Sequence, residues 1–216
     1  MVRLFVILFI LVCFSCEQKP VNNSFIPKAN EHFNDDNRDR AAWQKPSLVI
    51  NKLGDLTGKT VADIGAGTGY FAFRLAFKAE KVIAVEIDRS LIDLMNGIKI
   101  NLPAEMQAHF ETRLAGPDDA HLNPEEADVV VVINTITYIE EKEAYLKSLY
   151  NGLKRGGKIL VLDYKAIDIP LEDIPALNER LPADQLGLAL AKAGFMDIDI
   201  DNNSLDYQYM VMASKN

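Results

Sequence analysis

Short apolar runs alternate with amphipathic segments along most of this chain. The apolar runs are rich in Val and Ile, as in strands that a sheet buries on both faces, and occur at residues 60–64, 81–88, 107–114, 128–134 and 158–163. Helical periodicity, with apolar residues every three or four positions, occurs at residues 38–53, 70–77, 89–98, 141–154 and 183–193. Two further strands, 195–200 and 207–213, are separated only by a short turn. The pattern predicts an α/β fold with a doubly wound seven-stranded sheet, mostly parallel with an antiparallel last strand, and helices on both faces.

The first buried strand runs directly into a glycine-rich turn. Residues 60–71 read TVADIGAGTGYF, with Gly65, Gly67 and Gly69 at alternate positions. Glycine tolerates positive φ and lets a ligand approach the backbone without meeting a Cβ atom. The N-terminus of the helix that follows offers free amide N–H groups. The turn therefore predicts a nucleotide-type binding site.

Two acidic residues limit the class of ligand that this turn can bind. A dinucleotide site has the spacing G-x-G-x-x-G and faces a pyrophosphate, whereas here the third glycine comes one residue early and Asp63 precedes the turn. A carboxylate at that position repels phosphate and favours a ligand with a cationic amino group. Glu86 ends the second apolar strand, where an acid accepts hydrogen bonds from ribose hydroxyls. A NAD-binding oxidoreductase is accordingly the weaker interpretation.

These residues resemble motif I and the following acid of class I S-adenosylmethionine (SAM)-dependent methyltransferases, in particular the UbiE-like and generic bacterial methyltransferase-domain proteins. The resemblance covers residues 40–215 and implies a Rossmann-like fold, SAM as cofactor and methyl transfer. It implies that Asp63 orders the methionine end, that Gly65 and Gly67 pack under the cofactor and that Glu86 holds the ribose. Asp118, or Asp119 one step on, would accept from the adenine amino group, although an Asp-rich turn after Pro117 is the competing interpretation. The cofactor-binding residues expected in all are Asp63, Gly65, Ala66, Gly67, Gly69, Glu86, Ile87, Asp118, Asp119 and Asn134.

Candidates for a catalytic base are fewer. Methyl transfer from a sulfonium depends mainly on alignment, and a base is needed only if the nucleophile arrives protonated. Asp163 and Tyr138 are the candidates, with His121 more distant. Relatives often carry histidine near Tyr138, which weakens a role carried over from them. No metal site is expected, because the carboxylate cluster that would let Asp163 and Asn134 hold magnesium is absent from the sequence.

Charge and cysteine content exclude several function classes. The chain has 216 residues and a formal net charge of −8, which argues against a nucleic-acid partner. Both cysteines, Cys13 and Cys16, lie near the N-terminus. The segment after residue 16 therefore has no disulfide, no cysteine metal site and no thiol-based mechanism.

The first sixteen residues differ in character from the rest. Nine apolar residues, 4–12, follow a short basic start, a length that suits a secretory signal and is too short to span a bilayer. The segment resembles a bacterial lipoprotein signal at residues 1–16, with Cys16 as the lipidated residue. Residues 17–37 read as a flexible tether and 38–216 as the methyltransferase domain. The expected location is the bacterial cell envelope, anchored on the periplasmic side, or the cytoplasm if this leader is not used.

The leading hypothesis is an enzyme that methylates a small-molecule or lipid-like acceptor. Residues 166–184, rich in Ile, Leu and Pro, lie where such enzymes insert a substrate lid. Trp43 or Gln44, on the first predicted helix, is expected either to touch the cofactor or only to pack. The alternative is a non-catalytic SAM-binding or sensing module at the membrane. Binding without turnover would distinguish it.

Overall fold

The computed structural model describes residues 40–216. The predicted signal peptide at 1–16, the tether at 17–37 and the lipidation site Cys16 lie outside these residues. Within 40–216, no helix combines the length and the apolar character needed to cross a bilayer.

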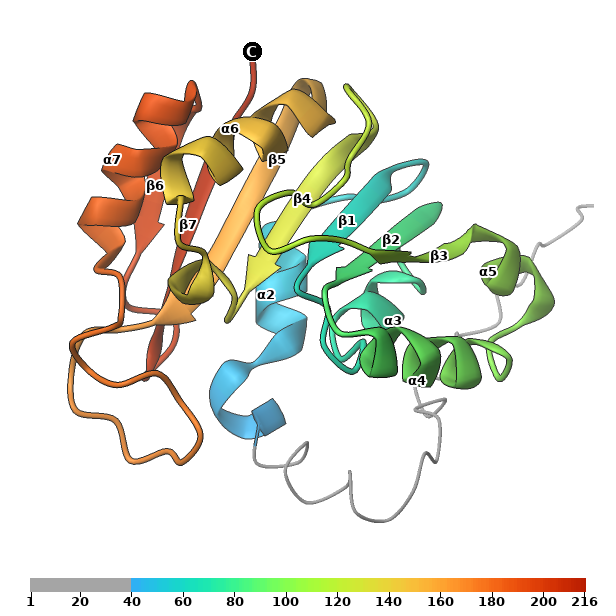
Figure 1. Ribbon diagram of the computed structural model, residues 1–216, viewed down its shortest axis with the longest axis horizontal. Coiled ribbons are helices and arrows are strands. Elements are labelled where there is room, and N and C mark those ends of the chain that lie inside the picture. The colour runs from blue at the N-terminus through green and yellow to red at the C-terminus, as the bar shows by residue number, and fades with distance from the viewer. Residues whose placement is uncertain (1–39) are drawn as a thin grey trace, which may run out of the picture.

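The described chain forms one seven-stranded sheet with the order β3-β2-β1-β4-β5-β7-β6 (Figure 1). Strand β7 is antiparallel to both of its neighbours, and the other pairings are parallel. The predicted sheet, with its antiparallel last strand, is thereby confirmed. The strands are β1 (Thr60–Ile64), β2 (Lys81–Glu86), β3 (Phe110–Leu114), β4 (Ala127–Ile133), β5 (Leu153–Tyr164), β6 (Met196–Asp201) and β7 (Gln208–Ser214).

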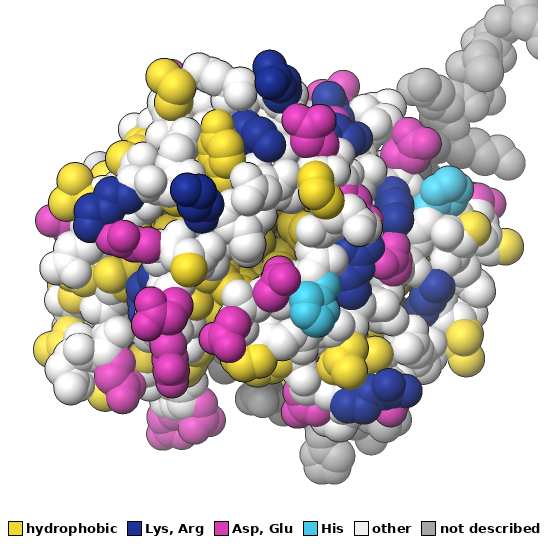
Figure 2. Space-filling view, turned by 45° about the horizontal axis from the view of Figure 1, so that its top comes forward, with side chains coloured by type: hydrophobic (Ala, Val, Ile, Leu, Met, Phe, Trp, Pro, Cys, Tyr) yellow, Lys and Arg dark blue, Asp and Glu magenta, His cyan; other side chains and the backbone are white. Residues whose placement is uncertain are grey.

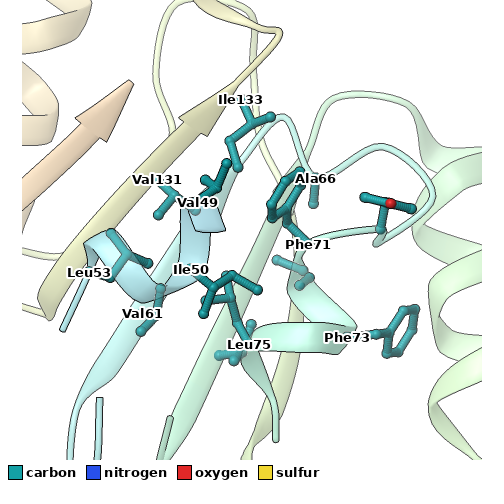
Figure 3. Packing of buried hydrophobic residues seen from close by; sticks show 14 of the residues in the cluster. Val49, Ile50, Leu53, Val61, Ala66, Phe71, Phe73, Leu75, Val131 and Ile133 are labelled. Atoms are coloured by element: carbon teal, nitrogen blue, oxygen red, sulfur yellow. The ribbon is translucent and has the colours of Figure 1, made fainter. Parts of the chain in front are cut away.

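Helices cover both faces of the sheet because alternate strand residues point to opposite sides. Val61 of β1 lies in one apolar cluster, while Ala62 and Ile64 lie in the other. The first cluster includes side chains of α2, α3 and α4, and the second those of α6 and α7. Figure 3 shows Val49 of α2 and Leu53, directly after this helix, against the strands of the first cluster. The helices are α2 (Pro46–Lys52), α3 (Ala72–Leu75), α4 (Arg89–Lys99), α5 (Ala104–His109), the 3₁₀ helix η2 (Ile136–Tyr138), α6 (Lys142–Gly152) and α7 (Ala183–Ala193).

Several predicted elements have different bounds in the structure; β5, for example, begins at Leu153, within the predicted helix 141–154. The continuous helix predicted over 38–53 is broken at Lys45, which has φ 48° and ψ 60°. Residues 40–44 are helical, and α2 starts anew at Pro46, because a residue before proline avoids the right-handed helical region. The strand predicted from Gln107 begins only at Phe110. The Gln107 side chain instead donates to the carbonyls of Ile100 and Leu102, at 3.0 and 2.8 Å, and closes the end of α4.

The strand order reverses between β1 and β4, since the chain moves outward from β1 to β3 and then returns to the middle of the sheet (Figure 1). In open α/β sheets, ligands bind at the carboxyl ends of the strands beside such a switch point. The ends of the parallel strands there carry the glycine turn, Glu86, the loop after Leu114, Asn134 and Asp163. The fold thus brings the predicted site residues to one edge.

Candidate active site

The three glycines after β1 serve different purposes. All adopt positive φ, at 71° for Gly65, 57° for Gly67 and 84° for Gly69. A Cβ atom on Gly65 would lie 2.2 Å from Thr135 Oγ1, and one on Gly69 would lie 2.6 Å from the Phe73 ring. A Cβ atom on Gly67 would meet no atom of residues 40–216 within 4 Å. Packing therefore requires two of the glycines, and the turn is open at Gly67, where a ligand can approach the backbone.

Glu86 is held at the end of β2 by backbone amides. Its Oε2 accepts a hydrogen bond from Gly67 N at 2.8 Å, and its Oε1 accepts from Ile87 N at 2.8 Å and Asp88 N at 3.1 Å. Each carboxylate oxygen has more than one lone pair, so the group can still accept from two neighbouring hydroxyls. Ile87 beside it is 60% exposed and offers an apolar surface. These positions suit a ribose with an attached ring.

Asp63 is the most perturbed acid at this edge. Its side chain is buried, and Oδ2 has no hydrogen-bond partner within residues 40–216. Burial raises the pKa of Asp63 to about 7, against the lowering effects of the Arg40 charge and the Ala72 N–H. A buried acceptor without a partner costs free energy unless a ligand satisfies it. A cationic donor fits this oxygen best.

Two arginines flank Tyr70, just after the glycine turn. The Arg40 guanidinium carbon lies 4.3 Å from the Tyr70 ring centroid, and that of Arg74 lies 3.8 Å from it. Burial lowers the pKa of both arginines, and Asp63 acts on Arg40 in the opposite direction. A guanidinium and a carboxylate therefore stand near each other, a combination that complements a zwitterionic group.

A buried amide cluster joins residues 40–44 to the ends of β4, β5 and β7. Gln44 Nε2 donates to Gln208 Oε1 at 3.0 Å, and Gln44 Oε1 accepts from Arg40 Nε at 2.6 Å. Gln208 Nε2 donates to Asn134 Oδ1, while Asn134 Nδ2 donates to the Tyr164 hydroxyl at 3.3 Å. Asn134 has φ 55°, a conformation that asparagine tolerates well. The cluster fixes the short helix against the sheet edge.

Gln44 is thus occupied by protein partners, and Trp43 packs. The Trp43 ring centroid lies 6.1 Å from that of Tyr164 and 6.3 Å from that of Tyr207. Packing of Trp43 is thus observed, and a contact of Trp43 or Gln44 with the cofactor stays a prediction.

The two predicted base candidates lie on neighbouring elements. Asp163 is buried, and its carboxylate accepts from Tyr164 N at 2.7 Å and Thr137 N at 3.3 Å. Burial raises the pKa of Asp163. Tyr138 is 64% exposed at the end of η2, and burial together with the Asp163 charge raises its pKa. His121 is exposed on the β3–β4 loop.

Asp118 and Asp119 lie on the exposed loop after β3. Asp119 Oδ1 accepts from His121 N at 2.8 Å, and Gly116 and Asp119 form an isolated bridge. An Asp-stabilised turn is therefore present, and Asp118 is exposed on it. The adenine role of these residues stays a prediction. In the described part of the chain, His, Cys, Asp and Glu form no group of three able to hold a metal ion.

Sequence reasoning missed Arg40, Tyr70, Arg74 and Gln208 as members of this edge. Gln208 carried a usable signal, because it is a polar residue at the start of an otherwise apolar strand. The others carried none, since their roles depend on contacts between distant segments.

Residues 55–207 match the family described as "Methyltransferase domain". The match spans more than half of the chain, which therefore belongs to the methyltransferase-domain family. The ubiquinone/menaquinone biosynthesis C-methyltransferase UbiE of Rhizobium rhizogenes is 28% identical over 139 residues, 61% of this chain and 52% of that protein. Phosphoethanolamine N-methyltransferase 1 of Zea mays is 29% identical over 159 residues, 69% of this chain and 30% of that protein. The chain thus spans about half the length of UbiE, and less of the maize enzyme.

Solved structures share the fold. A SAM-dependent methyltransferase from Aquifex aeolicus has a TM-score of 0.72 at 21% identity, covering 81% of this chain and 92% of that one. The [4+2]-cyclase SpnF has a TM-score of 0.68 at 14% identity, covering 82% of each chain. At such identities the likeness establishes the fold alone, and a protein named for a different reaction shares it.

Proposed function

We propose that this chain binds SAM at the carboxyl ends of β1 and β2 and transfers its methyl group to a small-molecule or lipid-like acceptor. The observation that carries the proposal is the buried Asp63 carboxylate, whose Oδ2 has no hydrogen-bond partner in the described part of the chain, beside a glycine turn that is open at Gly67. Family membership supports the same conclusion. Pyrophosphate-containing cofactors are disfavoured, because Asp63 places an acid where they need backbone N–H donors.

The residues fit the parts of SAM in order. Asp63 would accept from the methionine ammonium, and the Arg40 guanidinium, the positive charge that acts most on Asp63, would hold the methionine carboxylate. Glu86 would accept from the ribose hydroxyls. Ile87 would lie against the adenine, with Asp118 or Asp119 accepting from its amino group. When bound, SAM supplies a methyl group on a sulfonium sulfur that is itself the leaving group.

The protein's part in the reaction is to orient the reactants and, where necessary, to accept a proton. Asp163 lies at the end of β5 with a pKa raised by burial, which makes it a better base than an exposed aspartate. Tyr138 would line the acceptor side. Asp163→Asn and Tyr138→Phe are therefore expected to lower turnover while leaving SAM binding unchanged.

The observations define the class of methyl acceptor less closely than they define the cofactor. One relative is named for ubiquinone/menaquinone biosynthesis and another for phosphoethanolamine, and both names support a small or lipid-like acceptor. On the face drawn in Figure 2, Lys and Arg side chains alternate with Asp and Glu and form no basic patch. Together with the net charge of −8, this supports the expectation that nucleic acid is not a partner.

The experiment is calorimetry of the full chain with SAM and S-adenosylhomocysteine, beside Asp63→Ala and Glu86→Ala, followed by an acceptor panel with radiolabelled SAM. We expect binding that either substitution weakens strongly, and methyl transfer to at least one acceptor. Absence of binding by folded protein would refute the proposal. Binding without transfer to any acceptor would favour the SAM-sensing module.

Membrane anchoring through a lipidated Cys16 is proposed on the sequence alone. The apolar run at residues 4–12 and the polar segment after Cys16 support it. Expression in a bacterium with labelled palmitate should label the wild-type chain and leave Cys16→Ser unlabelled in the soluble fraction. If the wild-type chain is found in the cytoplasm and carries no label, the proposed anchor is wrong, and the proposed cofactor site is unaffected.

A further inference from the structure

The loop between β3 and β4, residues 115–126, carries Asp118 and is tied back to β3 by one side chain. Figure 1 shows the loop leaving β3 at the edge of the sheet and crossing to β4 near its middle. Arg113, the penultimate residue of β3, makes a bidentate pair with Glu126, from Nη1 to Oε2 at 2.7 Å and from Nη2 to Oε1 at 2.8 Å. Arg113 Nη1 also donates to the His121 carbonyl at 2.9 Å. The guanidinium therefore binds the returning half of the loop at two places.

The pair is stronger than an ordinary surface ion pair. The Arg113 and Glu126 side chains are only 14% and 16% exposed, and bidentate charge-assisted bonds are among the strong ones in proteins. The Arg113 hydrogen bonds lower the pKa of Glu126 to about 2, and Glu126 raises the pKa of Arg113. Glu111 on the same strand accepts from Arg113 Nε at 2.8 Å and orients the guanidinium.

The other half of the loop is tied to the ribose-binding strand. Ala115 N donates to the Glu86 carbonyl at 2.9 Å, which continues the β2–β3 pairing beyond Leu114. Gly116 and Asp119 then close the turn, and Ala120 is buried beneath it. Asp118 thus lies between one attachment at Glu86 and a second attachment at Arg113.

We propose that Arg113 is a positioning residue for cofactor recognition: through Glu126 and His121 it holds the Asp118–Asp119 turn at the place where the adenine amino group arrives. The inference rests on the proposed SAM site. Arg113 does not touch the cofactor. It sets how well the site distinguishes a 6-amino purine from a 6-oxo purine, because that distinction requires an acceptor fixed in position.

The test compares two ligands on the full-length chain by calorimetry: S-adenosylhomocysteine and its 6-oxo analogue, S-inosylhomocysteine. We expect the wild type to prefer the 6-amino ligand by about 10-fold or more, as for a hydrogen bond to a charged acceptor. Arg113→Lys keeps the charge and loses the fork, and should bring this ratio close to one. Lys81→Met is the matched control, because Lys81 pairs with Glu111 at 2.8 Å on the same sheet edge without contacting the loop; its ratio should remain that of the wild type.

A double-mutant cycle separates positioning from general stability. If Arg113 acts through Asp118, then Asp118→Asn lowers the ratio, and adding Arg113→Lys lowers it no further. An equal loss of affinity for both ligands in Arg113→Lys, or an unchanged ratio, would overturn the inference while the SAM site stands. Failure of the wild type to bind either ligand would overturn both. Should Arg113→Lys not fold, Glu126→Gln addresses the same pair from its other side with the same expected ratio.

Discussion

The backbone N–H of Gly67 donates to the Glu86 carboxylate at 2.8 Å, and this bond joins the glycine turn after β1 to the end of β2. Gly67 is the glycine on the open side of the turn, so the bond aligns the two segments that a nucleoside would contact. Glu86, the proposed ribose acceptor, is thus oriented by the protein's own backbone. A pre-oriented acceptor binds with a smaller entropic cost than a mobile one.

Glu86→Gln should weaken S-adenosylhomocysteine binding by about 10- to 100-fold, the cost of losing a charged acceptor for hydroxyl donors. The fold should persist, because the glutamine carbonyl oxygen can still accept from Ile87 N and Asp88 N, and only Gly67 N loses its acceptor. Calorimetry measures the change. The control is Asp88→Asn, two residues on, where an exposed carboxylate caps α4 through Ser90 N and asparagine caps equally well. An undiminished affinity in Glu86→Gln would remove Glu86 from the ribose site.

Gly65 and Gly67, two of the three glycines of the turn, should respond differently to alanine. Gly65→Ala would place a methyl 2.2 Å from Thr135 Oγ1, so backbone or side chains must shift, and such overpacking costs about 1–3 kcal/mol. Gly67→Ala meets open space and bears only the strain of positive φ, about 1–2 kcal/mol. In Gly67→Ala, the loss of cofactor binding free energy should be larger than the loss of unfolding free energy. Urea unfolding and calorimetry on both variants give the comparison, and a Gly67→Ala protein with wild-type affinity would contradict it.

The stability of the protein should depend on pH through the titration of Asp63. The folded-state pKa is about 7 and the ordinary value is 3.8, so between these pH values the folded state holds a proton that the unfolded state has lost. The contribution of Asp63 to stability is therefore present below pH 4 and is lost as pH rises to 7, at up to about 1.4 kcal/mol per pH unit. Asp63→Asn removes this dependence.

The measurement is the difference in unfolding free energy between Asp63→Asn and wild type at pH 5, 6, 7 and 8, which cancels the other titrating groups. Asp63→Asn should gain on the wild type steadily up to pH 7 and then hold its advantage. It should also lose cofactor affinity, since the ammonium needs the ionised carboxylate. A difference that does not vary with pH would mean that Asp63 is ionised throughout.

The fold, and the position of the glycine turn and the two acids at one edge of the sheet, could be predicted from the sequence because both depend on local pattern. The glycine turn follows the buried strand β1 directly, and the acids at positions 63 and 86 lie near the ends of β1 and β2. The break at Lys45 follows from Pro46. This local signal was available in the sequence, but the apolar periodicity favoured one continuous helix. The start of β3 was wrong because the Gln107 amide serves α4, a contact that no periodicity reveals.

The contacts between distant segments could not be derived in this way. The buried amide cluster joins residues 164 positions apart, Gln44 and Gln208, and the pairing exists only after the sheet has formed. Arg40 likewise acts on Asp63 and Tyr70 across the fold. Polar residues in apolar surroundings indicate that a partner is needed, but not which residue supplies it.

The Gln44–Gln208 pair provides a final prediction. Both side chains are almost fully buried. Gln44→Met leaves Gln208 Oε1 without its donor, and Gln208→Met leaves Gln44 Nε2 without its closer acceptor, each at about 1–3 kcal/mol. The double variant removes both amides, and we expect it to cost less than the sum of the singles, with a coupling of about 1 kcal/mol. Urea unfolding of the four proteins gives this coupling. The control pairs Gln44→Met with Gln107→Met. Gln107 lies on α5 and caps α4, so the losses of unfolding free energy in these two variants should be additive. Additivity in the Gln44–Gln208 cycle would mean that residues 40–44 are held by their apolar contacts, such as Trp43 on Tyr164, and not by the amide cluster.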